Sequence, residues 1–177
     1  MNKNFLLITG GTGGHVIPAQ NLGNYLLKKK TNCRIIVDKR GHKYINNFKG
    51  KIHIINSSNL SGNIILKLFG LVKLLYGFLE SMFIIFYFKP KIVVSFGSYA
   101  SFFPLFSCLI LKPFFKIDLY IHEQNSVLGR TNSFFLKYVN KILLNFEISS
   151  NINYKYNFKT HIVGYPESYK KNNDVEE

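Results

Sequence analysis

The sequence has no tryptophan and only two cysteines among its 177 residues. Cys33 and Cys108 cannot form a disulfide framework and lack the spacing of metal ligands, so we expect a protein of a reducing compartment. Hydrophobic residues make up 47% of the chain and charged residues 18%, a balance that excludes a disordered protein. The apolar run Phe5–Ile8 ends at the polar Thr9 and is too short for a signal-peptide core, so no export signal is expected.

The chain also has few acidic residues and little arginine. Its 23 Lys+Arg outnumber its 9 Asp+Glu, which gives a net charge of +14, yet only three of the basic residues are arginine. Isoleucine, asparagine and aromatic residues are abundant too, so part of the charge is attributable to an AT-rich coding bias. Nucleic-acid recognition favours arginine, and no nucleic-acid-binding motif is present, so we expect no nucleic-acid partner. Lysines scattered among aromatic residues fit an anionic membrane surface better.

Short apolar segments alternate with helical patterns along the chain. The expected strands are Phe5–Thr9, Arg34–Asp38, Lys51–Ile55, Lys91–Ser95, Ile117–Ile121, Lys141–Leu144 and His161–Val163. The expected helices are Pro18–Lys30, His42–Phe48, Ile64–Phe88, Ser101–Leu111 and Thr131–Val139. Several strands are apolar on both faces, so the pattern predicts an α/β fold with a doubly wound parallel sheet. We expect a single domain over residues 1–168 and a loose polar tail over residues 169–177.

The expected helix Ile64–Phe88 is mostly apolar and long enough to span a bilayer. Three charged residues interrupt it, namely Lys67, Lys73 and Glu80. Each charge at a bilayer centre costs about 2.5–3.5 kcal/mol, which disfavours a spanning helix. A helix that packs one face on the sheet and turns another toward lipid fits the pattern better, while a spanning helix and an ordinary core helix remain alternatives.

A cluster of four glycines follows the first expected strand, in the segment Gly10–His15, which reads GGTGGH. Glycines allow backbone N–H groups to approach an anion closely, and the start of the next helix adds positive potential. Pro18 suits the first turn of that helix. The segment is not a dinucleotide fingerprint, since Val16 stands where a third glycine is needed, and it lacks the Lys-Ser/Thr of a P-loop. Anion binding is therefore favoured over the alternative of a simple tight turn.

Two further polar clusters follow expected strands. His122–Asn125 comes directly after Ile117–Ile121, and Ser95–Ser101 ends the preceding strand. His122 and Glu123 would point to opposite sides of an extended chain, so they do not form a metal pair by themselves. Caps of the next helix, made by Asn125 or Ser126, are the simpler alternative. Because parallel strands end at one edge of the sheet, we expect all three clusters to line one crevice.

Taken in order, these motifs resemble the N-terminal half of the MurG-like enzymes of glycosyltransferase family 28. The matching segments are GGTGGHVIP (10–18), FGSYAS (96–101), HEQNSVLGRTN (122–132) and IVGYP (162–166). The resemblance covers about residues 4–167. It implies a Rossmann-like domain of a GT-B glycosyltransferase in peptidoglycan synthesis, which transfers N-acetylglucosamine from UDP-GlcNAc to undecaprenyl-diphospho-muramoyl-pentapeptide.

The resemblance also implies roles for individual residues, with neither a metal nor a cofactor. The acceptor diphosphate would be held by Gly11, Thr12, Gly13 and Gly14. His15 is a candidate general base in an inverting transfer, with simple hydrogen bonding to the diphosphate as the alternative. Asn125 would contact the donor sugar. Tyr99 would lie on the acceptor side, unless it only packs.

Some positions depart from the family pattern. Ser98 replaces a glycine, Phe102–Phe103 replaces a Gly-Pro pair, and residues 164–168 read GYPES rather than GNPVR. The donor-binding C-terminal half lies outside these residues, so we expect transfer only with a separate C-terminal half that binds UDP-GlcNAc. The resemblance further implies a peripheral position at the cytoplasmic face of the inner membrane. The alternatives are an inactive truncated transferase and a non-catalytic module that binds a lipid diphosphate.

Overall fold

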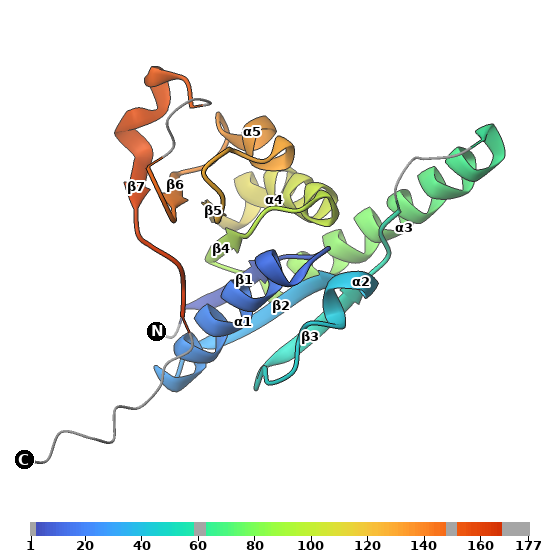
Figure 1. Cartoon of the computed structure of the whole chain (residues 1–177). Helices are drawn as coiled ribbons and strands as arrows, with labels where there is room; N and C mark the ends of the chain where they lie inside the picture. The colour runs from blue at the N-terminus through green and yellow to red at the C-terminus, as the bar shows by residue number, and fades with distance from the viewer. Residues whose placement is uncertain (1–2, 59–62, 148–151, 168–177) are drawn as a thin grey trace, which may run out of the picture.

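The computed structural model describes residues 3–58, 63–147 and 152–167. Strands and helices alternate through these ranges (Figure 1). The strands are β1 (Asn4–Ile8), β2 (Asn32–Asp38), β3 (Lys51–Ile55), β4 (Ile92–Ser95), β5 (Asp118–Glu123), β6 (Lys141–Leu144) and β7 (Thr160–Ile162). The helices are α1 (Gly13–Lys28), α2 (Lys39–His42), α3 (Ile64–Phe88), α4 (Phe102–Phe115) and α5 (Arg130–Phe135), with short 3₁₀ segments η1 (Tyr99–Ser101) and η2 (Tyr154–Lys159).

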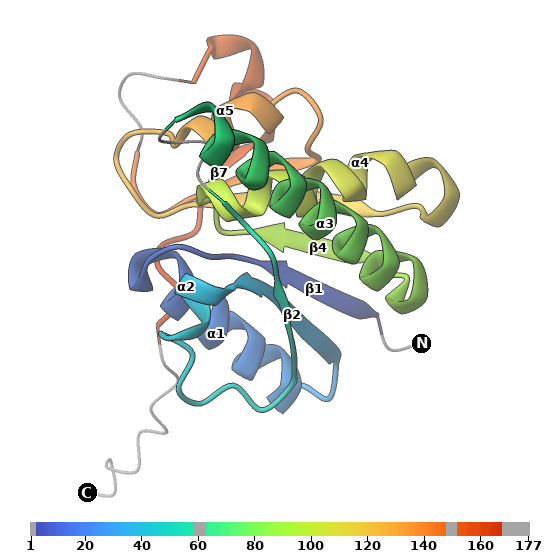
Figure 2. The ribbon, with the colours of Figure 1, turned by 90° about the vertical axis from the view of Figure 1, so that its right-hand side faces the viewer.

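The strands form one parallel sheet in the order β3-β2-β1-β4-β5-β6-β7. The direction of winding reverses between β1 and β4, because the chain leaves the β3 edge through α3 and returns to the centre (Figure 2). This is the doubly wound architecture that the sequence predicts. In such sheets, ligands bind beyond the carboxyl ends of the strands at the reversal point.

Both faces of the sheet are covered by packed side chains. On one face, Leu6 and Ile8 of β1 pack in a core with residues of α3, α4 and α5. On the other, Leu7 joins Val16 and Ala19 of α1. Burial on both faces explains why β1 reads as a continuous apolar run rather than an alternating one.

The expected strands agree with the observed ones, with small shifts at their ends, whereas several helix bounds differ. α1 begins at Gly13, so Pro18 lies inside the helix rather than in its first turn. The expected helix His42–Phe48 is wrong: α2 ends at His42, and its N-cap is Asp38, which accepts a hydrogen bond from the backbone N–H of Gly41. Thr12 makes no side-chain cap for α1, whereas the cap of α2 is a local residue, and helical periodicity alone reveals neither start.

Two later helices also differ from the sequence prediction. α4 continues to Phe115 with Pro113 inside its last turn, and α5 ends at Phe135. His122 and Glu123 are the last residues of β5 rather than part of a loop. The predicted tail, residues 169–177, lies outside the described residues.

α3 has one buried stripe and one broad exposed face. The stripe consists of Gly70, Leu74, Gly77, Ser81, Ile85 and Phe88. Gly77 has no room for a side chain, since a Cβ there would lie 2.0 Å from the backbone oxygen of Asn56. The N-terminal part of α3 projects past the rest of the molecule (Figure 1). Within the described residues α3 is therefore packed along one stripe only, and the helix is long and apolar enough to cross a membrane by length and composition alone.

Candidate functional site

The three polar clusters predicted from the sequence meet at the carboxyl edge of the sheet. In register, Ile8 of β1 lies beside Ser95 of β4, which lies beside Ile121 of β5. The backbone N–H of Phe96 also donates to the oxygen of Ile8 at 2.8 Å. The segments that follow these strands are therefore neighbours, as expected for a crevice at the reversal point.

The glycine loop uses some of its backbone N–H groups within the fold and leaves others available. Gly11 has a φ of 76°, and its N–H donates to Oδ1 of Asp38 at 2.8 Å. The N–H of Thr12 donates to the oxygen of Gly10 at 3.1 Å. Within the described part of the chain, the N–H groups of Gly13 and Gly14 have no acceptor. These first-turn groups carry the positive end of the α1 dipole, so they suit an anion, whereas the N–H of Gly11 is already engaged.

Asp38 organises this loop from the end of β2. Its side chain is fully buried and accepts hydrogen bonds from the N–H groups of Gly11 and Gly41, from Arg40 and from Ser57. Burial by itself raises the pKa of this carboxyl, but the four hydrogen bonds outweigh it and lower the pKa below its usual value. Asp38 thus remains ionised and holds the loop. The sequence motifs did not predict this role, although the position of an acidic residue at the end of a strand was a signal for it.

His15 lies on the first turn of α1 and faces the end of β4. Its Nδ1 atom lies 2.8 Å from the backbone oxygen of Phe96 and 2.8 Å from Oε1 of Gln124. The histidine thereby joins the glycine loop to the segment after β5. Its Nε2 atom has no partner within the described residues.

Glu123 shapes the segment that carries Asn125. The carboxylate is buried and accepts four hydrogen bonds, two from the backbone and side-chain nitrogens of Asn125, and one each from Gly129 N and Asn132 Nδ2. Asn125 itself is exposed. Because its Nδ2 donates to Glu123 at 3.0 Å, its Oδ1 is left to accept from a ligand hydroxyl.

The segment after β4 contains Tyr99 and the positions that depart from the family pattern. Tyr99 is 43% exposed in η1, so it is accessible rather than packed. Ser98 has a φ of 80°, which lies in a region that favours glycine. The serine therefore occupies a backbone position that suits the glycine of the family pattern. Phe102 and Phe103 join aromatic clusters, with Phe102 5.1 Å from Phe134 and Phe103 6.3 Å from Phe78 between ring centroids. Both therefore fix α4 against its neighbours.

Among the described residues, no group of three or more His, Cys, Asp or Glu side chains could hold a metal ion. Cys33 and Cys108 are both buried, and burial raises the pKa of the Cys33 thiol to about 12. Neither thiol lies at the crevice as a nucleophile.

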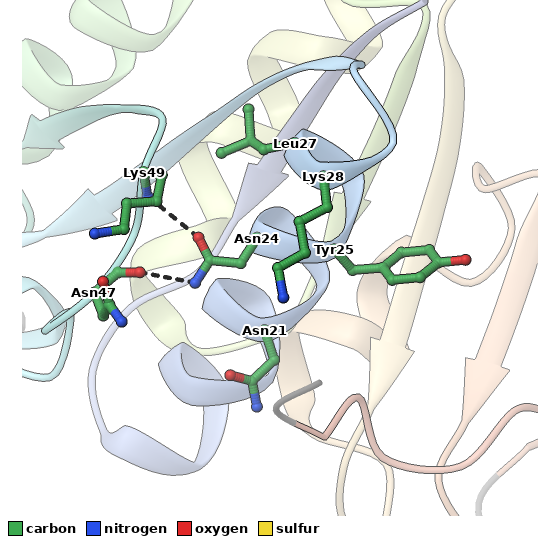
Figure 3. A pocket seen from close by; sticks show the side chains of 7 residues that line it. All are labelled: Asn21, Asn24, Tyr25, Leu27, Lys28, Asn47 and Lys49. Atoms are coloured by element: carbon green, nitrogen blue, oxygen red, sulfur yellow. Dashed lines mark hydrogen bonds between the residues drawn. The ribbon is translucent and has the colours of Figure 1, made fainter. Parts of the chain in front are cut away.

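Other hollows lie elsewhere on the molecule. One, of about 410 Å³, is lined by the C-terminal half of α1 and the segment before β3 (Figure 3). Its Asn24 side chain is already bonded to Asn47 O and Lys49 N, and the hollow lies toward the amino edge of the sheet, away from His15. An apolar groove of about 620 Å³ lies between α4 and the region of α5. Its lining residues are Phe106, Leu109, Ile110, Lys112, Pro113, Phe134 and Tyr138.

Comparison with known proteins relates this arrangement to one family. Residues 5–144 match the family described as the glycosyltransferase family 28 N-terminal domain. The chain is 37% identical over 150 residues to the UDP-N-acetylglucosamine–N-acetylmuramyl-(pentapeptide) pyrophosphoryl-undecaprenol N-acetylglucosamine transferase of Rickettsia typhi, and 36% identical over 151 residues to that of Rickettsia canadensis. These matches cover 85% of the chain but only 37% and 40% of the relatives, so the chain spans about two-fifths of their length.

Solved structures show the same fold. The crystal structure of MurG from Acinetobacter baumannii superimposes with a TM-score of 0.70 at 23% identity, covering 85% of this chain and 43% of that one. The glycosyltransferase of kitacinnamycin superimposes with a TM-score of 0.64 at 8% identity, covering 99% of this chain and 55% of that one. At these identities the likeness extends to the fold, and a single Rossmann-like domain of a GT-B glycosyltransferase accounts for it.

Proposed function

The chain belongs to glycosyltransferase family 28, and on this premise we propose that it is the acceptor-binding half of a MurG-like transferase. Residues 1–168 would form the family's N-terminal domain. The acceptor would be an undecaprenyl-diphosphate-linked muramoyl peptide, and the donor UDP-N-acetylglucosamine, as the names of the relatives state for those enzymes. A C-terminal half, on the same or another polypeptide, would bind the donor.

One observation carries this proposal: His15 of the glycine loop lies 2.8 Å from Gln124 of the HEQN segment. The contact brings two distant motifs to one crevice at the carboxyl edge of the sheet. The available N–H groups of Gly13 and Gly14, together with the Thr12 hydroxyl, would hold the diphosphate there. Gly11 would shape the loop rather than donate to the phosphate, because its N–H donates to Asp38.

The chemistry follows from the positions of the polar groups. Nε2 of His15 would accept the proton of the attacking acceptor hydroxyl, as a general base. The hydroxyl oxygen would form a bond to the anomeric carbon, while the bond from that carbon to UDP breaks and UDP leaves with the electron pair. Asn125 Oδ1 would accept a hydrogen bond from the donor sugar, and Tyr99 would lie on the acceptor side. We propose no role for a metal or a cofactor.

The acceptor's lipid tail requires a membrane nearby, and the exposed face of α3 would provide the contact. Its large apolar side chains include Leu68, Phe69, Leu71 and Leu75, each more than half exposed. Lys67 and Lys73 lie on the same helix and are exposed, so they could reach anionic headgroups. The protein would therefore be peripheral at the cytoplasmic face of the inner membrane.

The segment Lys112–Lys116 contributes less to this surface than its sequence suggests. Phe114 is 76% exposed, and it would enter the acyl boundary. Phe115 instead packs on Phe86, with ring centroids 5.7 Å apart. Lys112 donates hydrogen bonds to the oxygen of Tyr138 and to Oδ1 of Asn140, so it anchors the end of α4 rather than reaching freely into solvent.

Reconstitution tests the proposal. The 177-residue chain is mixed with the C-terminal half of the Rickettsia typhi relative, lipid acceptor and UDP-N-acetylglucosamine, and transfer of the sugar is measured. We expect turnover only in the mixture, and His15→Ala to reduce it by about 10²–10⁴-fold, as loss of a general base does. Asn125→Ala is also expected to reduce turnover, whereas Asn24→Ala, which lies on α1 but away from His15, is the matched control.

Turnover by the chain alone would contradict the proposal that a C-terminal half must bind the donor. Lipid binding without turnover in the mixture would favour the non-catalytic module, and neither binding nor turnover would favour the inactive truncated form.

A further inference from the structure

At the carboxyl edge of the sheet, an unbroken chain of hydrogen bonds ends at His15. Oε1 of Gln124 lies 2.8 Å from Nδ1 of His15, and Nε2 of Gln124 lies 3.0 Å from Nδ1 of His122. Nε2 of His122 lies 3.0 Å from the backbone oxygen of Gly164, beyond β7. Gln124 and His122 are both buried, so water does not compete for these groups.

Three backbone carbonyl groups determine the direction of every hydrogen bond in this chain, because a carbonyl oxygen can only accept. The oxygen of His122 lies 3.1 Å from Nε2 of Gln124, which fixes the amide with its nitrogen toward His122 and its oxygen toward His15. The oxygen of Phe96 then faces Nδ1 of His15 at 2.8 Å. That Nδ1 atom is thus surrounded by two acceptors, Phe96 O and Gln124 Oε1, and it must carry the proton.

The same reasoning assigns His122 the opposite form. Its Nδ1 atom receives a hydrogen bond from the Gln124 amide, so this nitrogen carries no proton. Its Nε2 atom faces the oxygen of Gly164 and must donate. Burial lowers the pKa of His122, which agrees with a neutral ring in this position.

We infer that Gln124 is a positioning residue, held by His122, that keeps His15 in the Nδ1–H tautomer with the lone pair of Nε2 directed away from the protein wall. The inference rests on the proposed role of His15, because the tautomer matters only if Nε2 accepts a proton. The hydrogen bond on one ring nitrogen of a histidine fixes the state of the other, so a buried acceptor pair at Nδ1 prepares Nε2 as a base. The chain of contacts runs from Gly164 through His122 and Gln124 to His15.

The direct test reads both tautomers by NMR in the 177-residue chain. The protein is labelled with ¹⁵N-histidine, and two-bond ¹H–¹⁵N correlations are recorded at mildly alkaline pH, with His15→Gln and His122→Gln used for assignment. We expect a protonated Nδ1 and a bare Nε2 in His15, and the reverse in His122. A proton on Nε2 of His15 would overturn the inference, since Phe96 and Gln124 would then not be acceptors for its Nδ1.

A second measurement isolates Gln124 from Phe96. Gln124→Met removes one of the two acceptors, and we expect the ¹⁵N resonances of His15 to shift from a single tautomer toward averaged values. Gln20→Met is the matched control, since Gln20 lies on the same helix as His15 but, among the described residues, accepts from the N–H groups of Asn46 and Asn47 and not from His15. Unchanged His15 resonances in Gln124→Met would show that Phe96 suffices, and would overturn the role of Gln124.

These outcomes are separate from those of the proposed function. The tautomers are measured without donor, acceptor lipid or a C-terminal half, so their measurement tests the role of Gln124 independently of sugar transfer. Turnover in the reconstituted mixture with the wrong His15 tautomer would reject the positioning role alone. The expected tautomers without lipid binding would reject the transferase proposal alone.

Discussion

Oδ1 of Asp38 accepts a hydrogen bond from the backbone N–H of Gly11 at 2.8 Å, and so ties the glycine loop to the end of the neighbouring strand β2. A Cβ atom at Gly11 would lie 2.9 Å from Oγ of Ser98, and the φ of 76° there disfavours any other residue. The loop that faces the proposed diphosphate is therefore bonded to β2 on one side and has no room for a side chain on the other, beside Ser98.

Substitutions of Gly11 and Asp38 test how strongly the stability of the fold depends on their hydrogen bond. Gly11→Ala is expected to lower the free energy of unfolding by about 1–2 kcal/mol, the cost of a left-handed conformation for a residue with a Cβ. Asp38→Ala should cost about 2–4 kcal/mol, because it leaves the buried N–H of Gly41 and the partly buried N–H of Gly11 without an acceptor. Urea denaturation measures both. Asp38→Asn keeps the Oδ1 acceptor and serves as the milder control, and an equal loss in both Asp38 variants would contradict the role of these N–H groups.

The proposed diphosphate site can be blocked without disturbing the fold. Gly14 is helical and exposed, and a Cβ there would meet only Oγ1 of Thr12, at 3.8 Å. Gly14→Val is therefore expected to fold, yet its methyl groups would obstruct the N–H groups at the start of α1 and abolish binding of an undecaprenyl-diphosphate sugar. Gly14→Ala should weaken binding less, because its side chain is smaller. Both substitutions act by steric obstruction and not by backbone strain, because Gly11 has a positive φ whereas Gly13 and Gly14 do not.

Binding is measured by isothermal titration, and circular dichroism confirms the fold of each variant. Full affinity in a folded Gly14→Val protein would place the diphosphate elsewhere.

The α3 surface is expected to bind anionic vesicles. The protein should float with them in a density gradient, and flotation should weaken with salt, because each lysine near an anionic surface contributes about 1 kcal/mol that salt screens. Phe69→Ser with Phe114→Ser should reduce flotation, since both side chains are exposed, Phe69 on α3 and Phe114 in the last turn of α4.

Phe158→Ser is the matched control, because Phe158 is 82% exposed on η2, outside the α3 surface. Flotation that survives high salt and alkaline carbonate would instead indicate a spanning helix. Absence of flotation would contradict membrane contact.

His53 is expected to make the stability of the fold depend on pH. Its Nε2 atom is buried and, within the described part of the chain, has no hydrogen-bond partner. Burial, then the charges of Arg34 and Lys51, lower its pKa to about 4. The unfolded chain takes up a proton near pH 6.5, its usual pKa, which the folded state excludes down to about pH 4. Stability is therefore lost as the pH falls through this window.

The variant His53→Leu should flatten that pH dependence and, at neutral pH, add about 1 kcal/mol by removing a buried polar atom without a partner. Urea denaturation at several pH values measures it. His161→Leu, which removes an exposed histidine from β7, is the control. His122 also has a lowered pKa, caused first by burial, so some dependence should remain in His53→Leu. An unchanged slope would contradict the assignment to His53.

The amino-acid sequence by itself determined the doubly wound sheet and the edge at which the polar motifs meet. Apolar strands such as Phe5–Ile8 are local patterns, and the parallel order brings their carboxyl ends to one edge. The GGTGGH and HEQN motifs therefore predicted the family, and the structure brings the two motifs into contact through His15 and Gln124. The helix Ile64–Phe88 was also found with its observed bounds, because a long apolar segment bounded by polar residues needs no partner to be recognised.

Only the tertiary structure decided which polar atoms of these motifs are already hydrogen-bonded within the fold. The partners of His15 are Phe96 and Gln124, which lie 81 and 109 positions away in the chain, and Gly11 is paired with an aspartate 27 positions away. Local sequence patterns do not contain these pairings, because each depends on strand register and on the approach of segments that fold separately. Since a hydrogen bond requires its two atoms to lie about 3 Å apart, the use of each N–H group and each ring nitrogen is set by packing.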